Sequence, residues 1–217
     1  MERTASRVNI GCGPTPTLGW LNFDNSLSVR LAKYPLLAPV LESLGLLDEG
    51  QKRLVSAARN GAIRWADATK HIPLPDQSVE VLYTSHMVEH LDRTAVRRFL
   101  REARRVLAPN GIIRIVIPDL RKLVDQYTAE GNADVFMERA FLTLPRSRHL
   151  LDRLKHLVVG DRHHLWMYDG PSMCRLLSAT GFREPRLLAP GSTTIPNPGP
   201  LNLYERAEES AYVEALK

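Results

Sequence analysis

The stretch RVNIGCGPTPTLGWLNFD (7–24) joins two strand-like runs through a glycine loop and ends on an acid. RVNIG (7–11) is short and apolar, whereas WLNFD (20–24) alternates apolar with polar residues. Glycines in the loop (residues 11–13) let the backbone approach a ligand closely. Asp24 follows the first loop glycine by only 13 residues, and a parallel crossover needs a dozen. The spacing therefore predicts a first crossover reduced to about one helical turn.

Three further runs are strand-like: AIRWAD (62–67), VEVLYTS (79–85) and GIIRIVIPD (111–119). Between the last two lies an amphipathic helix, which we expect to begin near Asp92 and to stop at PNG, with Gly111 as its left-handed cap. Strand, helix and strand in this order are typical of a βαβ unit in a parallel sheet. The sequence therefore predicts an α/β protein.

Two helical insertions interrupt this alternation, at about residues 30–60 and 120–165. The first carries leucines and valines at helical spacing, and the second contains the basic stretch RSRHLLDRLKHLVV (146–159). A late helix is expected over 170–181, followed by two strand-like runs, PRLLAP (185–190) and SAYVEAL (210–216). We expect one domain over residues 1–217, with both insertions packed on its sheet and the segment 120–169 as a helical cap.

Composition narrows the function classes. The net charge of +5 favours acidic partners only mildly, and much of it lies in RTAVRRFLREARR (93–105), where a solvated helix face is favoured over a nucleic-acid stripe. The sequence predicts no membrane span and no secretory signal. Two cysteines, Cys12 and Cys174, give no disulfide framework and fit a cytoplasmic location.

Three features are expected to meet at the carboxyl ends of the strands, where open parallel sheets bind ligands. The glycine loop follows the first strand, Asp24 ends the second, and Asp67 ends the third. A carboxylate at Asp24 can accept hydrogen bonds from both hydroxyls of a ribose, and Asp67 from the exocyclic amine of a base. Together they indicate an adenosine-containing ligand, although each acid alone also fits a strand-end cap.

These segments, together with ADATKHIPLPDQSVEVLYTSHMVEHL (66–91) and HLWMYDGPSMCRLLSATGF (164–182), resemble the class I S-adenosylmethionine-dependent methyltransferases. The likeness is to the small bacterial type 11-like proteins, often encoded near polysaccharide or secondary-metabolite genes. It implies a Rossmann-like, mostly parallel seven-stranded sheet with helices on both faces, and S-adenosylmethionine as cofactor, with S-adenosylhomocysteine as product. The cofactor-binding residues that it implies are Gly11, Cys12, Gly13, Asp24, Asn25, Asp67, Ala68, Ser85 and His86.

The stretch SHMVEH (85–90) also spells H-x-x-E-H, a spacing known from zinc peptidases. Those enzymes place the motif inside a long helix with a third ligand supplied by the fold. Here a strand precedes it and a new helix starts at Asp92, so we expect Glu89 and His90 to hold a turn and no metal to bind. His163 and His164 remain the residues that could supply a missing ligand.

The acceptor is predicted to be a small molecule or saccharide, possibly acidic, methylated at a hydroxyl oxygen. Oxygen acceptors of high pKa need a base, for which His164 and His86 are the candidates. Trp166, Tyr168 and His163 are candidates for the substrate wall, although the two aromatics also fit a cap core and His163 a surface position. An RNA methyltransferase and a non-catalytic binding module remain alternatives, and a homodimer is left open. The motifs of DNA-base and catechol methylation are absent.

Overall fold

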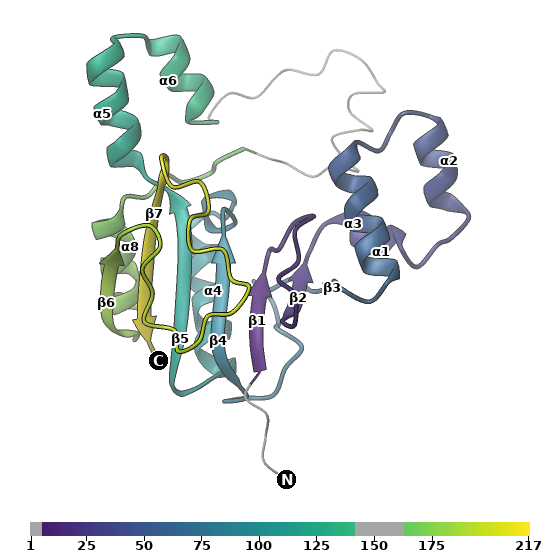
Figure 1. Ribbon diagram of the computed structural model, residues 1–217, viewed down its shortest axis with the longest axis horizontal. Helices are drawn as coiled ribbons and strands as arrows, with labels where there is room; N and C mark the ends of the chain where they lie inside the picture. The colour runs from purple at the N-terminus through teal and green to yellow at the C-terminus, as the bar shows by residue number, and fades with distance from the viewer. Residues whose placement is uncertain (1–5, 142–162) are drawn as a thin grey trace.

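The computed structural model describes residues 6–141 and 163–217, and its centre is a seven-stranded sheet in the order β3-β2-β1-β4-β5-β7-β6 (Figure 1). The strands are β1 (Ser6–Ile10), β2 (Leu21–Asp24), β3 (Arg64–Trp65), β4 (Val79–Ser85), β5 (Leu107–Pro118), β6 (Arg183–Leu188) and β7 (Ser210–Leu216). β7 runs antiparallel to both of its neighbours, and the other pairs are parallel. The mostly parallel seven-stranded sheet is thus confirmed.

The strand order reverses between β1 and β4. β1 pairs in parallel with β2 on one side and with β4 on the other, so the chain leaves neighbouring strands in opposite directions. This is the topological switch point, outside whose carboxyl ends ligands bind in open α/β sheets. We call the edge of the sheet where these strand ends lie the carboxyl edge.

The helices follow the predicted segments. They are α1 (Leu27–Leu31), α2 (Leu37–Ser43), α3 (Glu49–Arg59), the 3-10 turn η1 (Val88–His90), α4 (Arg93–Val106), α5 (Leu120–Glu130), α6 (Ala133–Arg139) and α8 (Gly170–Ala179). Asp92 caps α4, because its carboxylate accepts hydrogen bonds from the amides of Thr94 and Ala95. The basic stretch 146–159 lies outside the described residues.

Two local expectations need correction. Residues 11–20 contain turns but no helix, so the first crossover is even shorter than the predicted single turn. Gly111 is not the left-handed residue after α4, because Asn110 takes that conformation with φ 62°. The glycine is needed for space instead, since a Cβ at Gly111 would lie 3.0 Å from the carbonyl oxygens of Ala108 and Val79.

Only one face of the sheet is covered by helices within the described residues. α4 and α8 bury that face through Val96, Phe99, Leu100, Met173 and Leu177. The opposite face packs against Trp20 and against Ile195 and Leu201 of the loop 189–209, which crosses it in yellow in Figure 1. The described helices do not form the expected second layer, because α1–α3 lie beyond the β2–β3 end of the sheet and α5 and α6 beyond its carboxyl edge (Figure 1).

The first insertion is helical as predicted, but its apolar stripe is not packed on the sheet. Leu36, Leu37, Val40 and Leu44 are exposed, and Ala38 is the buried residue of α2. α1 packs on α3 in a small separate cluster that includes Cys12 and Val29. No helix among the described residues has the length and apolarity needed to cross a bilayer.

A buried ion pair holds the loop 189–209 on the sheet. Nη1 of Arg114 donates to Oε1 of Glu214 at 2.6 Å and to the Ser192 carbonyl at 2.9 Å, and both side chains are almost fully buried. Glu214 also accepts hydrogen bonds from the hydroxyls of Thr193 and Thr194. Burial raises the pKa of Glu214, but these hydrogen bonds outweigh it and leave the pKa lowered.

We expect Glu214→Ala to lower the free energy of unfolding by about 3–5 kcal/mol, because Arg114 would stay buried without its carboxylate. Urea unfolding at neutral pH measures this change. Glu184→Ala, which removes an exposed glutamate, is the matched control and should lower the free energy of unfolding by about 0–1 kcal/mol. Since the pKa is lowered in the folded state, the stabilisation is complete above the ordinary glutamate pKa of about 4.3 and is lost as the pH falls through the folded-state value. Equal losses for the two variants would contradict this account.

Candidate active site

A pocket of about 520 Å³ opens at the switch point, between the carboxyl ends of β1 and β4. Its volume lies in the range of small-molecule sites. One wall is the glycine loop with the turns that follow it, and another is the end of β4. The loop before β7 closes the third side. The lining residues are Asn9, residues 11–18, Tyr83, Ser85, His86, Pro200, Asn202, Glu205 and Arg206.

The glycine loop is held in place by the second strand. The amides of Gly11 and Cys12 both donate to the Phe23 carbonyl, at 2.8 and 3.2 Å. Gly11 has φ 68°, and a Cβ there would lie 2.5 Å from Cγ of Met87, so only glycine fits. Cys12 is buried, and burial followed by the charge of Asp24 raises the pKa of its thiol. The thiol is therefore protonated and is no nucleophile at neutral pH.

Asp24 lies directly behind this loop. Its Oδ2 accepts a hydrogen bond from the Gly13 amide at 3.0 Å and its Oδ1 accepts one from the Ser26 amide at 2.8 Å. A carboxylate has about four acceptor positions, so each oxygen keeps room for another donor. Asp24 thus fits the predicted role of receiving hydroxyl groups, while Asn25, next along the chain, is exposed and offers its carbonyl to Nε1 of Trp65. Neither residue forms part of the pocket wall.

Asp67 has local partners. Its Oδ1 accepts from the amide and hydroxyl of Thr69, and Nζ of Lys70 lies 3.1 Å from Oδ2. Burial raises the pKa of Asp67, but these contacts outweigh it and lower the pKa. Ala68 is a buried core residue. Neither residue lines the pocket, so their role in base recognition stays a prediction, and the cap alternative for Asp67 matches its contacts.

His86 lines the pocket from the turn after β4. It has φ 48°, a conformation that non-glycine residues rarely adopt, and its amide donates to the Val116 carbonyl. Its Nε2 lies 3.0 Å from Oγ of Ser210 and its Nδ1 lies 3.3 Å from Oε1 of Glu89. Because its Nε2 contacts Ser210 and its Nδ1 faces the buried Glu89, His86 is better placed to orient a ligand than to take its proton.

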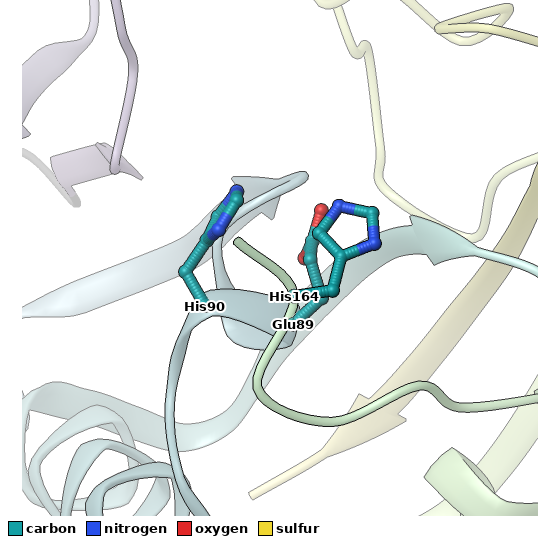
Figure 2. Close-up of side chains that lie close together, drawn as sticks. All are labelled: Glu89, His90 and His164. Carbon is teal, nitrogen blue, oxygen red and sulfur yellow. The ribbon is translucent and has the colours of Figure 1, made fainter. Parts of the chain in front are cut away.

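Behind His86 lies a group of side chains that we call the Glu89 cluster: Glu89, His90 and His164 (Figure 2). One ligand atom from each lies within 4.8 Å of the other two. The cluster is assembled across the chain, because the Glu89 carbonyl accepts hydrogen bonds from the amides of Leu165 at 2.7 Å and Trp166 at 3.2 Å. These bonds attach the end of the cap to η1.

The two imidazoles of the cluster are also fixed. Nδ1 of His90 lies 2.9 Å from the His163 carbonyl, and the ring centroids of His90 and His164 are 5.2 Å apart. Burial lowers the pKa of His164, with the charge of Glu89 acting in the opposite direction. His164 is therefore neutral at neutral pH and has a nitrogen lone pair to offer.

The proposed substrate-wall residues are not in the pocket wall. Tyr168 is a fully buried core residue joined to Asp119 by an isolated β-bridge. Trp166 lies on the surface under the guanidinium of Arg93, at 4.7 Å from its ring centroid. Tyr168 thus fits the cap-core alternative, whereas Trp166 is exposed beside α4 and does not, and a role of either in binding substrate stays a prediction. The backbone of His163 supports His90, and its side chain is only partly exposed.

A second pocket of about 410 Å³, which the sequence did not indicate, lies between α5, α6 and residues 206–209. Lys122, Arg139, Arg206 and Met167 are among its lining residues. Arg206 lines both pockets, so the two adjoin. Met167 in turn contacts His164, with Sδ to Nδ1 at 3.2 Å. The signal available in the sequence was weak, because these residues come from four separate stretches of the chain.

Residues 8–115 match the model of a family described as a methyltransferase domain. Among solved structures, an S-adenosylmethionine-dependent methyltransferase from Methanosarcina mazei superposes with a TM-score of 0.54 at 14% identity, covering 100% of this chain and 94% of that one. Another, from Archaeoglobus fulgidus, gives a TM-score of 0.50 at 15% identity, covering 99% and 87%. At such identities these likenesses show the fold. No curated protein matches the chain.

Asp24 gives the sharpest test of the pocket. We expect Asp24→Ala to weaken binding of S-adenosylhomocysteine by about 100-fold or more, because two hydrogen bonds to a charged group would be lost, each worth about 1.5–3 kcal/mol. Isothermal titration calorimetry measures this. Asp76→Ala is the matched control, because Asp76 is an exposed aspartate that precedes β4, at the opposite edge of the sheet. If Asp24→Ala binds as tightly as the control, the carboxylate is not part of the site.

Proposed function

Because the chain belongs to the class I S-adenosylmethionine-dependent methyltransferases, we propose that its acceptor is the hydroxyl oxygen of a small molecule or saccharide. The observation that carries the proposal is the adjacency of two pockets with a histidine and carboxylate cluster beside them. One pocket fits the cofactor and the other fits an acceptor of modest size. Polysaccharide or natural-product biosynthesis is the setting that we propose for such a reaction.

The switch-point pocket suits the cofactor. A side chain at Gly11 would collide with Met87, so the glycine keeps the loop close to that residue. A Cβ at Gly13 would meet no atom within 4 Å, so space remains above the loop. Asp24 would receive the ribose hydroxyls from behind the loop, and the carboxyl end of β4 would face the methionine part. Bound there, the cofactor supplies a methyl group on a positively charged sulfur.

The second pocket suits the acceptor. It is lined by Lys122, Arg139 and Arg206 together with Asp119 and Glu209, so charged groups of both signs lie in its wall. Nζ of Lys122 donates to the Ala207 carbonyl and Arg139 pairs with Glu130, which fixes two of the cations at its rim. A saccharide or small acid with several hydroxyl groups matches such a lining better than an apolar ring does.

Transfer to a hydroxyl oxygen forms an O–C bond and requires that the hydroxyl proton leave. His164 is the residue that we propose to act on the acceptor, as general base or orienting group, because its neutral imidazole contacts Met167 of the second pocket. His86 would hold the cofactor side, since its ring nitrogens contact Ser210 and Glu89. The pocket wall and the cluster would thus align the two reactants and exclude water.

RNA methylation is an alternative because α4 carries a row of exposed arginines. Arg93, Arg97, Arg98, Arg101 and Arg104 are all exposed on α4. None of them lines either of the two adjoining pockets, although Arg93 and Arg97 line a separate pocket of about 450 Å³ with Trp166. RNA as substrate would require affinity that falls steeply with salt, because each neutralised phosphate releases counterions. A non-catalytic module would bind the cofactor but transfer no methyl group to any acceptor.

We expect His164→Ala to lose about 10²–10⁴-fold in turnover, the usual contribution of a positioned acid–base group. Its melting temperature and its affinity for S-adenosylhomocysteine should hold, because the cap is attached by backbone amides of Leu165 and Trp166 rather than by this side chain. The measurement is methyl transfer over a panel of sugars and hydroxy acids. His163→Ala, one position away, is the control and should keep its turnover. A variant that melts early but turns over normally per folded molecule would assign His164 to docking.

A further inference from the structure

The carboxylate of Glu89 is buried in an unusual way. The side chain is 1% exposed, yet neither of its oxygens has a hydrogen-bond partner among the described residues. Nδ1 of His86 lies 3.3 Å from Oε1, but the geometry of this contact is not that of a hydrogen bond. Burying a carboxylate without donors is costly, and buried charges in proteins are normally paired or coordinate metals. The carboxylate therefore calls for a positively charged partner.

The same carboxylate faces two imidazoles. One ligand atom each from Glu89, His90 and His164 lies within 4.8 Å of the others (Figure 2). Zinc bonds of about 2.0–2.1 Å in a tetrahedron place neighbouring ligand atoms about 3.3 Å apart. Small side-chain rotations would close the cluster to that spacing. Two histidines and a carboxylate, with the fourth position open, are a ligand set of catalytic zinc sites.

The surroundings of the cluster also match those of a metal site. A metal-bound histidine almost always donates its other ring N–H to a carbonyl or carboxylate, which fixes the tautomer. Nδ1 of His90 lies 2.9 Å from the His163 carbonyl, so Nε2 is left with its lone pair. Nδ1 of His164 lies 3.2 Å from Sδ of Met167, and its amide donates to the Phe141 carbonyl. His86 stands beside Glu89 as an outer neighbour.

We propose that Glu89, His90 and His164 bind a divalent transition-metal cation, for which zinc is the probe. The sequence favoured the opposite, because H-x-x-E-H lies outside a long helix and lacks a third ligand nearby. The fold removes that objection: the amides of Leu165 and Trp166 bind the Glu89 carbonyl and bring His164 to η1. His86, the first histidine of the motif, is an outer neighbour and not a ligand.

The catalytic consequence rests on the proposed function. An acceptor hydroxyl at the open position would lose its proton to water more readily, since a bound cation lowers the pKa of its oxygen ligands. The oxygen lone pair would then form the O–C bond while the bond between sulfur and the methyl carbon breaks and its electron pair stays on sulfur. His164 would act on the acceptor through the cation instead of taking the proton itself.

The test uses the full chain without an affinity tag, stripped with a chelator and titrated with zinc chloride by calorimetry. We expect one zinc per chain, and a higher melting temperature with zinc, because the ion binds only the folded cluster. Glu89→Gln and His90→Ala should each weaken zinc binding by about 100-fold or more, because mutating even an outer neighbour of a metal site lowers metal affinity by about 10–100-fold. Glu89→Gln without metal should fold at least as stably as the parent, since it removes a buried charge.

His71→Ala is the matched control. His71 lies 3.4 Å from Glu102 on an exposed surface, so it is the kind of histidine that binds zinc adventitiously. Its loss should leave the affinity unchanged. Zinc affinity that drops in His71→Ala but not in Glu89→Gln would overturn the proposal, as would no zinc binding at all. Binding of S-adenosylhomocysteine is measured in parallel: if it persists while zinc fails to bind, the metal site is wrong and the methyltransferase function stands.

Discussion

The parallel pairing of β1 with both β2 and β4 is the constraint on which the site depends. It fixes the direction in which three chain segments leave the sheet, so the glycine loop, Asp24 and the His86 turn emerge side by side at the carboxyl edge. The Phe23 carbonyl then ties down the amides of Gly11 and Cys12. Sheet geometry, rather than any contact between functional side chains, creates the pocket.

The position of the cap depends on the backbone of Glu89. Its carbonyl receives two amides from the end of the cap, while its carboxylate enters the cluster with His164. One residue therefore both positions the cap and presents a charge to it. The 3-10 turn η1 suits this role, because its tight winding leaves the Glu89 carbonyl free for partners outside the turn.

The sequence predicted the parts that follow from local rules. β4 spans the predicted residues, Asp92 caps α4 as expected, and the crossover after β1 is short because 13 residues leave no room for a long helix. It could not predict that no described element would cover the apolar face of α2, since helical spacing marks an apolar stripe but not its partner. It named His163 and His164 as possible ligands beside the H-x-x-E-H motif, but it could not decide whether either lies next to Glu89, because that proximity depends on how the residues between them fold. Asp67 shows a third limit, because the sequence pattern of an acid after a strand is the same whether its carboxylate binds a ligand or a neighbouring threonine.

The loop 189–209 has two attachments that are chemically unrelated. Arg114 and Glu214 hold it against the sheet, and its residues Pro200, Asn202, Glu205 and Arg206 form part of the pocket wall. Only protein molecules whose loop lies on the sheet can bind a ligand in that pocket. Ligand binding and the buried ion pair therefore both shift the equilibrium between the open and closed loop toward the closed form. Amide hydrogens of this loop should consequently exchange more slowly with solvent deuterium as ligand concentration rises.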